Sequence, residues 1–169
     1  ATAADSYVRP MGAIASLINT QLSVAPGDSV TTELRIANNG DVVDEFTIEP
    51  LGDAADWIEP IPRTVSLFPG ADQIVTVIFA PPRAPTVRPG PTPFALKVVS
   101  REDATGSIVE EGAIDVGSFD DRSIELHPTT VTGRLGARYE LAIDNRGNEP
   151  IDVALAGSDP QAACDYRFS

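Results

Sequence analysis

One histidine and one cysteine occur in the 169 residues, and this limits the chemistry available to the chain. Nucleophilic catalysis needs a base beside the nucleophile, and an imidazole is the usual base. His127 stands directly before Pro128 at the end of an expected strand, so we interpret it as a surface or half-buried structural residue. Cys164 has no second cysteine with which to form a disulfide, and we expect it to be buried as a small apolar side chain.

Carboxylates occur in adjacent pairs, namely Asp44–Glu45, Glu110–Glu111 and Asp120–Asp121. Neighbours in a strand point to opposite faces, so Glu110 and Glu111 cannot hold one substrate together. Calcium binding at the third pair is an alternative to a solvated linker, but no loop of spaced aspartates supports it. The sequence contains no glycine-rich phosphate loop, zinc motif or dinucleotide fingerprint. We therefore predict no catalytic residue, no cofactor and no metal.

Trp57 is the one candidate ligand contact. Its indole could stack on a sugar ring, and a carbohydrate-binding surface would need Tyr7 and Phe94 to converge with it. Aromatic residues make up only 6% of the chain, however, and no tyrosine or second tryptophan lies near Trp57 in the sequence. We favour an interpretation of Trp57 as a plug at the core or edge of the fold.

The charge of the chain excludes two classes of partner. The net charge is −13 and no basic cluster interrupts it. Nucleic acids and anionic membrane surfaces both attract clustered lysine and arginine, so we expect neither nucleic-acid binding nor direct membrane binding. No stretch approaches the roughly 18 apolar residues of a membrane-spanning helix.

Apolar residues alternate with polar ones in short segments, which is typical of half-buried strands. The strongest pattern spans Ser29–Ala37, and a second spans Asp44–Glu49. Between them, Asn38-Asn39-Gly40-Asp41 predicts a tight turn, so we expect these two strands to form an antiparallel pair.

The following segments continue the all-β pattern. Residues Asp53–Trp57 fit a short helical turn or an irregular crossing, and six prolines within Pro81–Pro93 predict an extended, stiff loop. The density of β-branched residues in Gln73–Ala80 predicts a strand that is buried on both sides. The remaining expected strands are Thr64–Phe68, Phe94–Ser100 and Ser107–Val116. Short strands at regular intervals predict an immunoglobulin-like antiparallel β-sandwich.

The pattern then begins again. The run Leu34-Arg35-Ile36-Ala37-Asn38-Asn39-Gly40 is echoed 107 residues later by Leu141-Ala142-Ile143-Asp144-Asn145-Arg146-Gly147. An internal repeat takes precedence in interpreting a sequence. We therefore divide the chain into an N-terminal extension or first edge strand (1–18), a sandwich (19–117), an acidic linker (118–122) and a partial second immunoglobulin-like repeat (123–169).

The second repeat is expected to hold only about its first three strands, with Val153-Ala154-Leu155 matching Phe46-Thr47-Ile48. A sheet without a facing partner is poorly protected from water. Either the natural chain continues past Ser169 or another element covers this half, and we favour continuation.

Four motifs in order carry a resemblance to a known family. They are Val24-Ala25-Pro26-Gly27, the strand end Asn38-Asn39-Gly40, Trp57, and Leu67-Phe68-Pro69-Gly70. Residues 20–116 resemble bacterial and archaeal NEW3/CARDB-type immunoglobulin-like modules. The resemblance implies an accessory domain of a surface or secreted protein. The second repeat departs from the pattern, because His127-Pro128-Thr129 replaces the first Pro-Gly and no tryptophan follows.

We therefore expect a non-catalytic spacer or protein-interaction module of a larger bacterial envelope or surface protein. Its partners would be other domains of the same polypeptide or an envelope protein, and any membrane anchor would lie outside this chain. Two alternatives are a carbohydrate-binding module that accompanies a hydrolase and binds a glycan, and a strand-complementation domain that forms a strand-exchange dimer.

Overall fold

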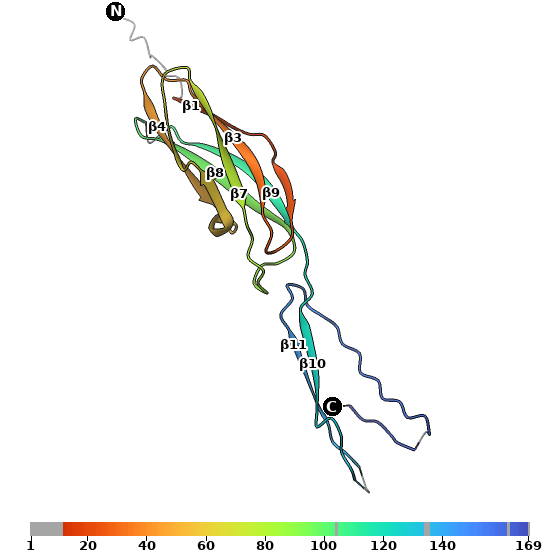
Figure 1. Ribbon diagram of the computed structural model, residues 1–169. Coiled ribbons are helices and arrows are strands. Elements are labelled where there is room, and N and C mark those ends of the chain that lie inside the picture. Colours follow the sequence, from red (N-terminus) through yellow and green to blue (C-terminus); the bar gives the residue numbers. More distant parts are fainter. Residues whose placement is uncertain (1–11, 104, 134–135, 162, 169) are drawn as a thin grey trace, which may run out of the picture.

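A computed structural model describes residues 12–103, 105–133, 136–161 and 163–168. Two sheets lie face to face up to Val116, and a separate two-stranded sheet extends from one end of this sandwich (Figure 1). The four-stranded sheet consists, in spatial order, of β1 (Ala13–Leu17), β3 (Val30–Asn38), β7 (Asp72–Phe79) and β5 (Ile58–Ile61). The five-stranded sheet consists of β2 (Gln21–Val24), β9 (Ile108–Val116), β8 (Gly90–Ser100), β4 (Asp44–Leu51) and β6 (Thr64–Leu67). The chain is thus all-β, as predicted.

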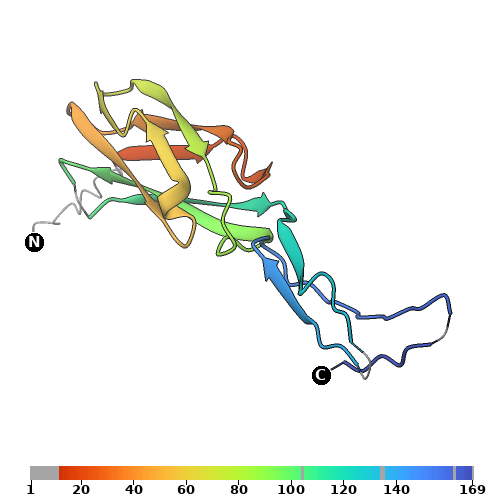
Figure 2. The ribbon, with the colours of Figure 1, turned by 60° about the horizontal axis from the view of Figure 1, so that its bottom comes forward.

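The core lies between the two sheets and follows from the alternation in the sequence. Leu34 and Ile36 of β3 are fully buried, and so are Phe46 and Ile48 of β4. Figure 2 shows the two sheets, and these side chains fill the space between them. The predicted helical turn is a 3-10 helix at Ala55–Trp57 that leads into β5.

The prediction that the first two strong strands pair with each other is wrong. β3 belongs to the four-stranded sheet, where it pairs with β1 and β7, whereas β4 pairs with β6 and β8 in the other sheet. Residues 39–43 carry the chain across the core rather than back along the same sheet. The two alternating patterns therefore meet face to face, which buries both apolar faces at once.

The prediction that β7 is buried on both sides is also wrong. Val75, Val77 and Phe79 point into the core, but Ile74 on the opposite face is 51% exposed. β7 has β3 and β5 as its neighbours, and its outer face is open to solvent at this point. The β-branched residues of this strand reflect the local preference of a pleated backbone rather than burial on two faces.

The proline-rich loop is shorter than predicted, because β8 begins at Gly90 rather than at Phe94. Pro91 and Pro93 pair with β9, opposite Asp115 and Ala113. The pairing of β8 with β4 starts only at Ala95, so both prolines lie where β8 has a neighbour on one side. A proline can occupy such an edge position without removing a hydrogen bond from the ladder.

The start of the described chain contributes to both sheets. β1 is an edge strand of the four-stranded sheet and pairs antiparallel with β3. Residues 18–20 then cross to the other sheet, where β2 pairs with β9. That pair is parallel, which departs from the otherwise antiparallel arrangement.

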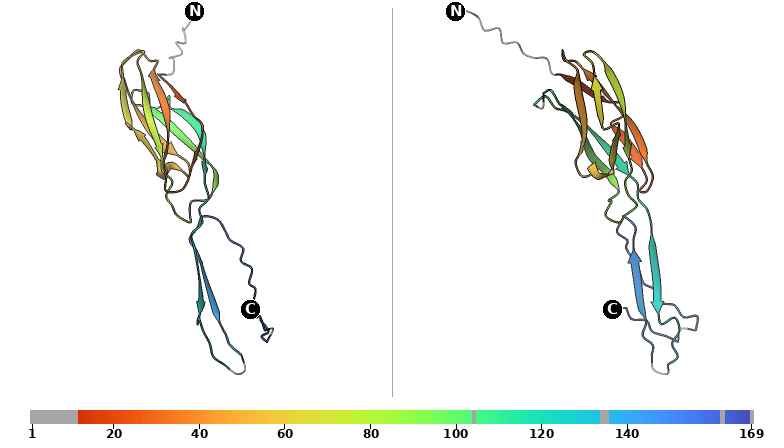
Figure 3. Two further views of the ribbon diagram at one scale, coloured as in Figure 1. Left: turned by 45° about the vertical axis from the view of Figure 1, so that its right-hand side comes forward. Right: turned by 60° about the vertical axis from the view of Figure 1, so that its left-hand side comes forward.

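The second repeat forms one hairpin, made of β10 (Arg122–His127) and β11 (Glu140–Asn145). The prediction of a third strand at residues 153–155 is wrong, because this stretch contains no strand and runs apart from the hairpin (Figure 3). In the first repeat the matching strand, β4, depends on β6 and β8 as neighbours. Residues 123–169 contain no described counterpart of those two strands, so the segment has nothing with which to pair.

Candidate functional site

Trp57 ends the 3-10 helix and packs, half-buried, against the core of the sandwich. Its backbone carbonyl accepts a hydrogen bond from the amide of Ala80 at 2.8 Å. The side chain thus contributes to the packing of the sandwich, as expected for a residue at the edge of the core. A glycan contact at Trp57 stays a prediction.

The structure describes one of the two aromatic residues named with Trp57. Phe94 is 3% exposed, and its ring centroid lies 4.6 Å from that of Phe79 inside the core. Phe94 is therefore wrong as a ligand contact, because the two sheets enclose it. Tyr7 lies outside the described residues.

The histidine and the cysteine lie in the second repeat. The side chain of His127 is exposed, with Nε2 3.0 Å from a carboxylate oxygen of Glu125. Cys164 is exposed as well, so the expectation that it is buried is wrong. That expectation rested on the usual burial of a free cysteine, whereas the second repeat forms a hairpin that no second layer covers within the described residues.

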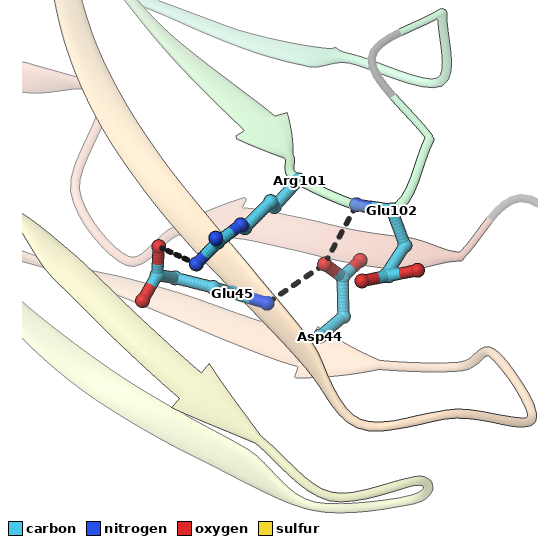
Figure 4. Close-up of polar contacts among 4 residues, drawn as sticks. All are labelled: Asp44, Glu45, Arg101 and Glu102. Carbon is cyan, nitrogen blue, oxygen red and sulfur yellow. Dashed lines mark hydrogen bonds and ion pairs between the residues drawn. The ribbon is translucent and has the colours of Figure 1, made fainter.

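The neighbouring carboxylates Asp44 and Glu45 have different surroundings (Figure 4). Asp44 is almost completely buried, and its Oδ1 accepts hydrogen bonds from the backbone amides of Glu45 at 2.7 Å and Glu102 at 3.1 Å. Its Oδ2 accepts a hydrogen bond from the hydroxyl of Ser100 at 2.5 Å. Glu45 points outward and pairs with Arg101 at 3.3 Å. Asp44 thus fastens the start of β4 to the end of β8.

A shallow cavity of about 240 Å³ adjoins this cluster. Its walls come from the turn after β3 and from the loop after β8, and they include the acidic residues Asp41, Asp44, Glu102 and Asp103. Both oxygens of Asp44 already accept hydrogen bonds from the protein, which is the bonding of a structural carboxylate. Among the described residues, no group of three histidine, cysteine or acidic side chains is arranged to hold a metal ion.

The turn after β3 and the turn after β11 contain the same two side-chain hydrogen bonds. Asn38 Oδ1 accepts a hydrogen bond from the amide of Gly40 at 2.9 Å, and its Nδ2 donates to the carbonyl of Val42 at 2.8 Å. Asn145 makes the same two bonds, from the amide of Gly147 at 3.0 Å and to the carbonyl of Glu149 at 2.8 Å. Each pair of equivalent residues is 107 positions apart, so the turn within the sequence repeat recurs in the structure.

The second copy of this turn is bound to the linker by Asn148, which is 1% exposed. Its Oδ1 accepts a hydrogen bond from the amide of Phe119 at 2.7 Å, and its Nδ2 donates to the carbonyl of Gly117 at 3.0 Å. The amide of Arg146 adds a bond to the carbonyl of Asp121 at 2.7 Å. We call residues 117–121 together with 145–149 the joint. Hydrogen bonds from Asn148 and Arg146 therefore join the two segments of the joint.

Two further contacts tie the joint to the sandwich. The guanidinium of Arg83, in the loop before β8, lies 4.2 Å from the centroid of the Phe119 ring, and the amide of Gly117 donates to the carbonyl of Val24 at 2.9 Å. A cation over an aromatic face is attracted by the ring quadrupole. The linker aspartates Asp120 and Asp121 are both exposed, as the interpretation of a solvated linker predicts, and Asp120 forms an exposed ion pair with Arg122 at 2.9 Å.

Gly147 allows the close approach of the linker. A Cβ at this position would lie 2.7 Å from the carbonyl oxygen of Phe119 and 3.3 Å from the amide nitrogen of Asp121. The recurrence of glycine at positions 40 and 147 is the feature of the sequence that indicates this turn. Asn148 has no such signal, because the equivalent position in the first repeat is Asp41, and sequence reasoning missed it.

Comparisons with known proteins identify the fold. No protein-family model matches the sequence, and no curated protein matches it. A family 123 glycoside hydrolase from Clostridium perfringens is similar in structure, with a TM-score of 0.50 and 11% identity over 62% of this chain and 27% of that chain. A FixG-related protein from Vibrio parahaemolyticus matches 62% of this chain and 96% of its own, with a TM-score of 0.49 and 18% identity.

PapD-like domain 7 of human CEP192 matches 70% of this chain and 94% of its own length, with a TM-score of 0.45 and 12% identity. At these identities the similarities show the fold alone. The chain contains an immunoglobulin-like β-sandwich. The narrower resemblance to NEW3/CARDB-type modules stays a prediction.

Proposed function

We propose that this chain is a non-catalytic accessory module that holds two immunoglobulin-like units at a set angle within a larger bacterial envelope or surface protein. The observation that carries the proposal is the joint. A flexible tether needs only a solvated, polar linker. Here a buried asparagine, a cation over a ring and a side-chain-free glycine fix residues 117–121 to both neighbouring elements.

The extracytoplasmic location is part of the proposal and rests on the resemblance drawn from the sequence. Among the described residues, no helix is long and apolar enough to cross a membrane. The partners would be other domains of the same polypeptide or an envelope protein, and the acidic surface would keep the module in solution. The chain would then set the relative orientation of the neighbouring domains, and any catalytic activity would belong to those domains.

Backbone relaxation of the ¹⁵N-labelled chain tests the role of the joint. We expect amide order parameters for residues 117–121 near the value of about 0.85 that is found in rigid backbone. Replacing Asn148 with alanine should lower them toward about 0.6, which marks flexible backbone. Asn39→Ala is the matched control, because Asn39 is an exposed asparagine in the equivalent turn of the first repeat. Low order parameters in the unaltered chain would contradict a fixed joint.

Assays of the purified chain against generic ester, peptide and glycoside substrates test the non-catalytic part of the proposal. We expect no turnover above that of buffer. Turnover that is abolished by Asp44→Asn or by another single acidic substitution would overturn it.

A further inference from the structure

The turn after β3 contains the only Asn-Gly dipeptide in the chain, at Asn39 and Gly40. The main-chain nitrogen that follows an asparagine is able to attack the side-chain amide carbon of that asparagine, which closes a succinimide ring. Glycine favours this attack, because it has no Cβ to obstruct the approach and its backbone dihedrals are the least restricted. Every other asparagine is followed by a larger residue, namely Thr20, Asn39, Arg146 or Glu149.

The side chain of Asn39 is accessible for this reaction. Asn39 is exposed, and its side chain forms no hydrogen bond with any described residue. Its main-chain amide donates to the carbonyl of Gly12 at 3.2 Å, which holds the backbone of Asn39 beside the start of β1. No described group therefore holds the side-chain amide away from Gly40, and water, which must later open the ring, reaches it from solvent.

The attacking nitrogen of Gly40 is restrained by the preceding asparagine. Its N–H donates to Asn38 Oδ1 at 2.9 Å, and Asn38 is itself held by hydrogen bonds from Nδ2 to the carbonyls of Val42 and Leu67. The attack requires this nitrogen to lose its proton and to turn toward Asn39, so the bond to Asn38 must break first. Breaking one hydrogen bond of ordinary net strength corresponds to roughly a fivefold change in an equilibrium constant, and Asn38 should slow the reaction by about this factor.

The second repeat has the same turn without the reactive side chain. The N–H of Gly147 donates to Asn145 Oδ1 at 3.0 Å, as that of Gly40 does to Asn38, but the residue between glycine and asparagine is Arg146. The hydrogen bonds of the turn therefore do not require an asparagine at the position of Asn39. The second turn provides an internal comparison in which the nitrogen is restrained in the same way and the amide carbon is missing.

We propose that Asn39 is a site of spontaneous deamidation in the folded protein, and that the hydrogen bond from Gly40 to Asn38 sets its rate. The Gly40 nitrogen gives its proton to water and bonds to Asn39 Cγ, and the side-chain nitrogen leaves as ammonia. Water then opens the ring at either carbonyl, which leaves aspartate or isoaspartate at position 39. This inference is independent of the proposed spacer role, because it concerns the turn after β3 and not the joint.

The two products differ in their effect on the turn. Aspartate keeps the course of the main chain and adds a negative charge close to Asp41. Isoaspartate carries the main chain through the former side-chain carbon and lengthens it, so the amide of Gly40 no longer reaches Asn38 in the same geometry. We expect the isoaspartate form to lose this hydrogen bond and to unfold with an equilibrium constant larger by about fivefold.

Peptide mapping by mass spectrometry, after incubation of the full chain at neutral pH in ¹⁸O-labelled water, tests the proposal. We expect Asn39 to convert faster than the other asparagines, to gain ¹⁸O, and to convert at least about fivefold more slowly in the folded chain than in urea. Asn38→Ala should accelerate the reaction of the folded chain about fivefold. Val75→Ala is the matched control, because it destabilises the sandwich from a fully buried core position and leaves the turn intact, so the rate should stay nearly unchanged.

Four results would overturn the proposal. One is an Asn39 that stays an amide in the folded chain while it converts in urea, and another is an equal rate in the two conditions. The third is an unchanged rate in Asn38→Ala. The fourth is equal acceleration by Asn38→Ala and Val75→Ala, which would place the reaction in the unfolded state. Circular dichroism confirms that both variants are folded, and the comparison with urea uses the unaltered chain and depends on neither variant.

Discussion

Replacing Asn38 with alanine should destabilise the sandwich more than a single hydrogen bond would suggest. This side chain is 1% exposed, and it bonds with the amide of Gly40 and the carbonyls of Val42 and Leu67, the last at 2.9 Å. The bond to Leu67 joins the end of β3 to a strand of the opposite sheet. Its loss removes the only side-chain hydrogen bond of Asn38 that crosses between the two sheets.

The magnitude follows from these contacts. Asn38 makes three side-chain hydrogen bonds, and each contributes about 1 kcal/mol net. We therefore expect Asn38→Ala to lower the free energy of unfolding by about 2–4 kcal/mol. For a domain of this size, that corresponds to a fall in melting temperature of at least about 10 °C.

Urea unfolding followed by tryptophan fluorescence is the assay, because Trp57 is the only tryptophan and it packs against the core of the sandwich. Asn145→Ala is the internal control. It removes the two equivalent turn bonds in the second repeat, where no equivalent of the Leu67 bond is formed within the described residues. The Trp57 transition should not move in this control. A loss below about 0.5 kcal/mol for Asn38→Ala, the range of ordinary surface substitutions, would refute the reasoning.

Three further predictions concern close packing and charge. Gly112→Ala would place a Cβ 2.8 Å from the carbonyl oxygen of Thr20, so thermal unfolding should show a loss of about 1–3 kcal/mol from overpacking. Gly147→Ala should loosen the joint as Asn148→Ala does, lowering order parameters in the linker without moving the Trp57 unfolding transition. The Arg35 guanidinium lowers the pKa of Asp72 through a hydrogen bond and then through charge attraction. This pair therefore stabilises the fold above about pH 3.9 and loses its effect as the pH falls through the lowered pKa. A carboxyl ¹³C titration should show the Asp72 pKa rising in Arg35→Gln, and an unchanged value would contradict the pairing.

The strands themselves could be predicted from the sequence because burial on one face imposes a period of two. The alternation around Leu34 and Ile36, and around Phe46 and Ile48, marks the inward side correctly. The pattern does not show which strand lies beside which. β3 and β4 each have one apolar face. These faces pack against each other across the core, because the two strands lie in opposite sheets and do not pair in one sheet.

The two errors in the second repeat share one physical cause, because the described hairpin has neither the strand partners nor the covering layer of the sandwich. The strand at residues 153–155 was expected from its match to β4, and the burial of Cys164 from the usual burial of a free cysteine. A strand persists only where backbone partners exist, so the same pattern that gives β4 gives an unpaired segment after β11. The turn hydrogen bonds of Asn38 recur at Asn145, but the strand partners of β4 do not recur in the described part of the second repeat.

The joint was only partly visible in the sequence. The asparagine and glycine of the repeated turn stand out because they recur, and both prove to be structural. The residue that binds the linker, Asn148, is a single polar residue among many in a turn. Its role depends on a backbone approach between residues 117–119 and 148, which no local pattern encodes.

A pulsed electron spin resonance distance between the two repeats tests the central claim most directly. Spin labels would be placed at the exposed positions Ser66 on β6 and Ser123 on β10, each changed to cysteine in a Cys164→Ser background. A fixed joint predicts one narrow distance distribution that broadens markedly on Asn148→Ala. A broad distribution in the chain with intact Asn148 would show that the joint does not set the angle between the units, and the spacer role would fail with it.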